Sequence, residues 1–102
     1  MYFCRSIMRI SAPEISNLLK SIKYFDSYAD VYLFGSRIDD NKRGGDIDIA
    51  ILSDKIDLKK KIDIKFNFFN DFGEQKLDIV IIENENQPFW KYIKEKAILL
   101  TE

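Results

Sequence analysis

The chain has 102 residues, of which 46% are hydrophobic and 14% aromatic, and this composition predicts one folded domain over residues 1–102 rather than a disordered chain. Its 16 basic and 17 acidic residues nearly cancel, which argues against a surface that holds long nucleic acid by neutralising phosphates. Histidine is absent, which excludes histidine-based metal sites and any catalytic triad or dyad with a histidine base within the chain. Catalysis would therefore use carboxylates, hydroxyls, lysine or arginine, and oxygen ligands favour magnesium or manganese over zinc or copper.

The cysteine content and the hydropathy of the chain indicate its cellular compartment. The single cysteine, Cys4, excludes an internal disulfide and is typical of a reducing cytosol. No apolar run approaches the roughly 18 residues that a membrane-spanning helix needs, and residues 1–10 lack the apolar block of a signal peptide. We therefore expect a soluble, cytoplasmic protein without a membrane partner.

The first predicted element is an amphipathic helix of roughly 13 residues that begins at Ser11. Ser11 is a good N-cap, and Pro13 and Glu14 suit the first turn. Its apolar residues recur at helical spacing: Ile15, Leu18, Leu19, Ile22 and Phe25. A strand is then predicted over residues 29–34, where β-branched and aromatic residues end at Gly35. A second strand is expected over residues 46–52.

The second half of the chain predicts helix, strand and helix. Ser53-Asp54 could cap a helix that ends at Gly73 and is rich in phenylalanine. Its apolar positions are Leu58, Ile62, Phe66, Phe69 and Phe72, and with Phe68 they cover more than one face, so the helix is either deeply buried or meets a partner. A third strand follows over residues 77–82, and a last helix from Phe89 to about Ile98. This order of elements predicts a small α/β (α+β) domain.

Aromatic residues gather at the start of the last helix. Phe89, Trp90 and Tyr92 are more typical of core packing than of a platform on which bases stack. We therefore expect all three to pack in the core.

Three aspartates interrupt otherwise apolar strands. Asp46 and Asp48 are two positions apart, so their side chains point to the same face, with Cα atoms roughly 7 Å apart. Like charges at that spacing are costly unless a cation neutralises them. Asp78 interrupts the third strand, which we expect to neighbour the second, so that three carboxylates would meet. Such a set can hold two magnesium ions roughly 3.5–4 Å apart, as in two-metal phosphoryl transfer.

A glycine turn precedes these aspartates. Gly35-Ser36 follows the first strand, and nine residues separate it from Asp46. A glycine at a strand end lets backbone N–H groups approach phosphates, the Ser36 hydroxyl adds a donor, and Arg37 would neutralise phosphate charge. Alone, a Gly-Ser pair is usually only a turn, and an Asp-x-Asp pair is more often an edge or calcium-loop feature. Their order and spacing together favour a site for metal and nucleotide.

This constellation resembles the signature of the DNA polymerase β-like nucleotidyltransferase superfamily. In its compact form the chain is similar to minimal nucleotidyltransferases, which are often the antitoxin half of toxin–antitoxin pairs. The resemblance implies a small mixed sheet flanked by helices, with two divalent metals (Mg²⁺, or Mn²⁺) held by Asp46, Asp48 and Asp78. It also implies that a nucleoside triphosphate, normally ATP, binds at Gly35 and Ser36, with Arg37 beside it.

The reaction implied by this resemblance is transfer of AMP to an acceptor hydroxyl with release of pyrophosphate. Larger members carry a second domain for the acceptor, whereas a chain of this length would obtain it from another protein. The partner so implied is a small all-helical toxin of the HEPN type, whose tyrosine is adenylylated in a type VII-like toxin–antitoxin complex. An alternative stays open: a non-catalytic nucleotide-binding module of the same fold that neutralises its partner by forming a complex.

Overall fold

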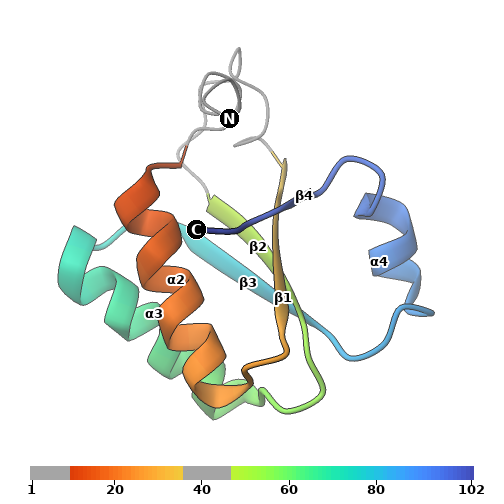
Figure 1. The fold of residues 1–102 in the computed structure, drawn as a ribbon, viewed down its shortest axis with the longest axis horizontal. Helices are drawn as coiled ribbons and strands as arrows, with labels where there is room; N and C mark the ends of the chain where they lie inside the picture. The colour runs from red at the N-terminus through yellow and green to blue at the C-terminus, as the bar shows by residue number, and fades with distance from the viewer. Residues whose placement is uncertain (1–9, 36–46) are drawn as a thin grey trace.

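The computed structural model describes residues 10–35 and 47–102, and they form a four-stranded mixed sheet with helices on both faces (Figure 1). The strands are β1 (Asp30–Phe34), β2 (Ile47–Leu52), β3 (Leu77–Ile82) and β4 (Ile98–Leu99), and the helices are α2 (Ala12–Phe25), α3 (Leu58–Phe72) and α4 (Pro88–Ile93). The spatial order is β3-β2-β1-β4, in which β2 and β3 are parallel and the other pairs antiparallel. This architecture confirms the predicted small α+β fold and the pairing of the second and third predicted strands.

The capping signals at the start of α2 act as the sequence predicts. The Ser11 side chain accepts a hydrogen bond from the backbone N–H of Glu14 (3.2 Å), and the Glu14 carboxylate accepts one from the N–H of Ser11 (2.9 Å). This reciprocal capping box satisfies two of the N–H groups that a helix start leaves unpaired. The helix then buries Leu18 and Ile22 completely.

The start of α3 differs from the prediction. Asp57 caps the helix by accepting a hydrogen bond from the backbone N–H of Lys60 (3.0 Å), so the predicted cap at Ser53-Asp54 is wrong. Ser53 instead donates a buried hydrogen bond to Asp26 (2.6 Å), which ties the end of β2 to the end of α2. The predicted C-terminal stop at Gly73 is confirmed.

The last predicted helix is also shorter than expected. It ends at Ile93, and residues 98–99 form the edge strand β4, which the sequence pattern did not predict. The Cα partners of Leu99 and Ile98 are Tyr32 and Leu33 of β1, and the N–H of Leu100 donates to the Val31 carbonyl (2.8 Å). Pairing with β1 satisfies backbone groups that an unpaired edge would leave open, which favours strand over helix here.

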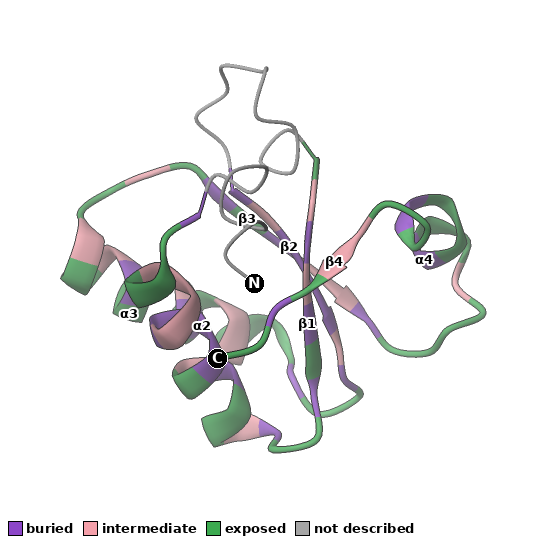
Figure 2. Cartoon of the chain, turned by 45° about the horizontal axis from the view of Figure 1, so that its top comes forward, coloured by how far each residue is buried: buried purple, intermediate pink, exposed green. Residues whose placement is uncertain are grey.

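Two apolar clusters sandwich the sheet. Odd-numbered strand residues face α2 and α3 and build the larger cluster, whose fully buried members include Leu33, Ile49 and Phe68. Even-numbered strand residues face α4 and pack with Trp90 and Ile93. Figure 2 shows the buried residues concentrated where the helices meet the sheet. Because side chains alternate along a strand, every even-numbered residue of β1, β2 and β3 points to the α4 side.

Candidate functional site

Two of the three predicted aspartates lie side by side. Asp48 of β2 and Asp78 of β3 are Cα partners in the parallel ladder. Neighbouring parallel strands are roughly 4.8 Å apart, and partners in register project from the same face. Their flanking residues are buried toward α2 and α3, so both aspartates project on the α4 side; Asp48 is half-buried and Asp78 is exposed.

The end of β1 adjoins Asp48 from the other side. Phe34 is the Cα partner of Asp48 in the antiparallel ladder, so Phe34, Asp48 and Asp78 form a row across three strands. The next residue, Gly35, has a backbone φ of +83°. A Cβ built on Gly35 would overlap Oδ2 of Asp48 and lie 3.0 Å from its Cγ. Only glycine lets the backbone approach this carboxylate so closely.

Three further predicted site residues are not among the described residues. Ser36, Arg37 and Asp46 lie outside the described residues. Within residues 10–35 and 47–102, no three His, Cys, Asp or Glu side chains are grouped so as to hold a metal ion. The predicted cluster of three aspartates includes Asp46, so its assembly stays a prediction.

The described pair suits a hard divalent cation. Asp48 and Asp78 offer carboxylate oxygens only, which are the ligands that magnesium and manganese prefer. Their charges repel each other across one strand spacing, and a cation between them relieves that repulsion. No lysine or arginine of the described residues forms an ion pair with Asp78. The chemistry of the donors and their placement therefore fit a divalent metal.

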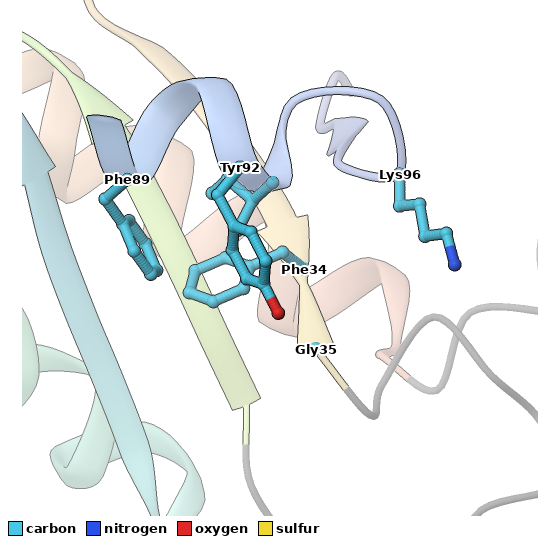
Figure 3. Close-up of a pocket in the computed structure, with 6 residues that line it drawn as sticks. Phe34, Gly35, Phe89, Tyr92 and Lys96 are labelled. Atoms are coloured by element: carbon cyan, nitrogen blue, oxygen red, sulfur yellow. The ribbon is translucent and has the colours of Figure 1, made fainter. Parts of the chain in front are cut away.

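A cavity of about 450 Å³ opens beside this row, under α4 (Figure 3). Its described lining residues are Phe34, Gly35, Phe89, Tyr92, Ile93 and Lys96. Phe34 and Gly35, the residues that adjoin Asp48, are thus also part of the cavity wall. The three aromatic rings gather beneath the helix, and the Lys96 side chain extends from the segment after α4 and points away from these rings.

The expectation for the aromatic residues of α4 is confirmed for one residue and wrong for two. Trp90 is buried and packs on Tyr32, with ring centroids 4.9 Å apart. Phe89 and Tyr92, however, are 39% and 84% exposed and line the cavity. Helical spacing gives no signal for this division, because Ile93 is four residues from Phe89 and three from Trp90 and therefore shares a face with each.

Tyr32 contributes no charge beneath α4. Burial raises the pKa of its hydroxyl, and the nearby carboxylates of Asp30 and Glu85 raise that pKa further. The phenol therefore stays protonated at neutral pH and cannot serve as a base in this part of the site.

In the described residues, no helix combines the length and apolar character needed to cross a membrane. A comparison with curated proteins finds no match. A comparison with family models finds the family described as "Polymerase beta, Nucleotidyltransferase", which matches residues 16–102. The match covers the four strands, both described aspartates, Gly35 and the cavity, and the mixed sheet with flanking helices agrees with the fold of that family. The chain therefore belongs to the polymerase β nucleotidyltransferase family.

Proposed function

We propose that this nucleotidyltransferase domain transfers AMP from ATP to a hydroxyl group of a partner protein. The observation that carries the proposal is the row on the α4 face, where Asp48 and Asp78 are opposed in register beside Gly35. The family generally uses a nucleoside triphosphate and a divalent metal. A pair of opposed carboxylates next to a close-packed glycine could hold a divalent metal, which would supply positive charge for a triphosphate.

Asp48 and Asp78, together with Asp46, would hold the metal ions. When bound, the ions would neutralise charge on the phosphates and make the acceptor hydroxyl a better nucleophile. Gly35 lacks the Cβ that would overlap the Asp48 carboxylate, so this carboxylate can keep its place against the end of β1. Asp78 is exposed and can accept the hydroxyl proton as the new bond to the α-phosphorus forms and the bond from that phosphorus to the departing pyrophosphate breaks. Ser36 and Arg37 are proposed to bind the phosphates.

The acceptor is proposed to come from a second protein. The described residues form one sheet with its helices, and they include no further domain that could present an acceptor. Asp78 lies on β3, which is an edge strand of this sheet, so a large molecule can approach it from that side. The resemblance to minimal nucleotidyltransferases suggests the partner: a small all-helical HEPN toxin that is inactivated when its tyrosine is adenylylated.

Label transfer tests this proposal directly. The purified protein is incubated with the product of the adjacent reading frame, magnesium and ATP labelled in its α-phosphate. We expect label on a tyrosine of the partner, and no label with Asp48→Asn. Asp63→Asn is a matched control, because Asp63 is an exposed acid on α3, across the sheet from the site. Label with Asp48→Asn at the wild-type rate would overturn the catalytic assignment.

A second candidate function is neutralisation by binding alone. Leu58, Ile62 and Phe66 are spaced by four residues on α3 and are all exposed, which gives that helix an apolar stripe on its outer surface. Such a stripe favours a protein partner. If Asp48→Asn still neutralises the partner and Phe66→Ser does not, complex formation rather than adenylylation is the mechanism.

A further inference from the structure

We propose that the cavity under α4 holds the nucleoside of the donor nucleotide, with Tyr92 and Phe89 as the surfaces on which the base packs. This inference rests on the proposed nucleotidyl transfer and assigns a place to the part of the donor that the carboxylates do not bind. The location, shape and charge of the cavity carry it.

The cavity lies next to Asp48, one of the carboxylates proposed to hold the metal ions. Phe34 is in register with Asp48, and Gly35 packs against the Asp48 carboxylate, while both residues also line the cavity. A phosphate group held at Asp48 therefore leaves the rest of its nucleotide next to the cavity mouth. The cavity lies on the β1 side of Asp48, whereas Asp78 lies on the opposite, β3 side. The donor nucleotide would therefore lie on the β1 side of Asp48, and the acceptor would approach from the β3 edge of the sheet.

The shape of the cavity suits a flat ring system. Its volume of about 450 Å³ is within the usual range for sites that bind small molecules. The rings of Phe34 and Phe89 meet edge to face with centroids 5.6 Å apart, and the rings of Phe89 and Tyr92 are 6.4 Å apart and tilted by 38°. Tyr92 is 84% exposed, so a large part of its ring is available for contact with a ligand. Exposed aromatic rings next to an apolar floor are the usual surface for base stacking.

The charge at the cavity suits an anionic ligand with an aromatic part. Lys96 is the one cation among the six described lining residues, and it is exposed. The other five residues carry no charge, so the wall offers apolar contact with a single positive group at its rim. A nucleotide combines these two properties. A tyrosine side chain of a protein acceptor lacks the negative charge that Lys96 would attract.

Calorimetric titration of the full chain in magnesium separates nucleoside binding from phosphate binding. ATP and inorganic tripolyphosphate are titrated into the wild type, Tyr92→Ala and Tyr92→Phe. We expect Tyr92→Ala to weaken ATP binding by about tenfold or more and to leave tripolyphosphate binding within about twofold. Tyr92→Phe keeps the ring and should bind ATP as the wild type does.

Tyr24→Ala is the matched control, because Tyr24 is an equally exposed helical tyrosine on α2, which packs on the opposite face of the sheet. It should change neither affinity. The inference alone is overturned by unchanged ATP binding in Tyr92→Ala, or by an equal loss of ATP and tripolyphosphate binding. Wild-type ATP binding no tighter than that of tripolyphosphate overturns it as well. Absence of any magnesium-dependent ATP binding by the wild type overturns the proposed function too, so the two failures are distinguishable.

Discussion

Asp48 and Asp78 are opposed in register on neighbouring parallel strands, although helix α3 separates them along the chain. This arrangement places two negative charges one strand spacing apart on a single face of the sheet. The next pair along the same ladder, Ile49 and Ile79, points to the other face of the sheet, and both of its side chains are buried against α2 and α3. The opposed carboxylates are therefore a feature of the site rather than of the core.

Replacing Asp78 with asparagine should separate function from folding. Asp78 is exposed, so Asp78→Asn should change the free energy of unfolding by less than about 0.5 kcal/mol without metal. Loss of a metal ligand should lower the rate of AMP transfer by more than about 100-fold. Replacing a residue that only hydrogen-bonds to a metal ligand already costs about 10–100-fold in metal affinity or activity. Magnesium should raise the melting temperature of the wild type more than that of the variant. A variant that keeps the wild-type rate would show that Asp78 has no role in transfer.

Gly35→Ala should damage both stability and activity. The positive φ of Gly35 costs any other residue about 1–3 kcal/mol, and the new methyl group would in addition displace the Asp48 carboxylate. Gly73→Ala is the matched control, because Gly73 has a φ of +81° with nothing within 4 Å of the place that an added methyl group would take. Urea unfolding should show a loss for both variants and a larger one for Gly35→Ala. Only Gly35→Ala should lose transfer activity, and equal activity in the two variants would contradict the role given to Gly35.

The elements defined by local patterns could be predicted from the sequence. The third strand runs from Leu77 to Ile82 in prediction and structure, because polar Lys76 and Glu83 bound an apolar run. The capping residues of α2 and the glycine after α3 mark their helix ends through backbone hydrogen bonds made within a few residues. That the second and third strands are neighbours followed from the small number of strands, whereas the register that opposes Asp48 and Asp78 comes from the structure.

The features that depend on distant partners could not be predicted. Residues 98–99 form a strand only because the edge of β1 is there to pair with them, and nothing in their own sequence excludes a continued helix. Likewise, a helical pattern identifies an apolar face but does not say which residues on it the sheet covers. Trp90 is covered by Tyr32 and its neighbours, whereas Tyr92 of the same short helix stays open and lines the cavity.

Two phenylalanines of α3 should differ sharply in their effect on stability. Phe68 is fully buried and packs on Phe72, with ring centroids 4.9 Å apart, whereas Phe66 is 66% exposed. Phe68→Ala should lower the free energy of unfolding by about 3–5 kcal/mol, because it removes buried contacts and leaves a cavity. Phe66→Ala should change it by less than about 0.5 kcal/mol. Urea unfolding measures both, and a large loss for Phe66→Ala in the isolated protein would contradict the exposed position of its ring.

Ser53→Ala should lower stability in a pH-dependent way. The Ser53 hydroxyl donates to Oδ2 of Asp26 (2.6 Å) and the N–H of Tyr28 donates to Oδ1 (3.0 Å). The Ser53 hydrogen bond is the main cause that holds the pKa of Asp26 below its ordinary value. A carboxyl group with a lowered folded-state pKa adds stability above its unfolded-state pKa, and this stability is lost as the pH falls through the folded-state value. The difference between wild type and Ser53→Ala should therefore be largest at neutral pH and should shrink in acid, once the pH falls below the ordinary pKa of an aspartate.

The control for this prediction is Ser21→Ala. The Ser21 hydroxyl donates only to the backbone carbonyls of Asn17 (3.1 Å) and Leu18 (3.3 Å), which do not titrate. Its loss should therefore cost the same free energy at both pH values. Asp57, whose pKa is also lowered because its carboxylate accepts the Lys60 N–H, contributes equally to all three proteins and cancels in the differences. A Ser53→Ala deficit that is as large in acid as at neutral pH would show that Asp26 does not carry the effect.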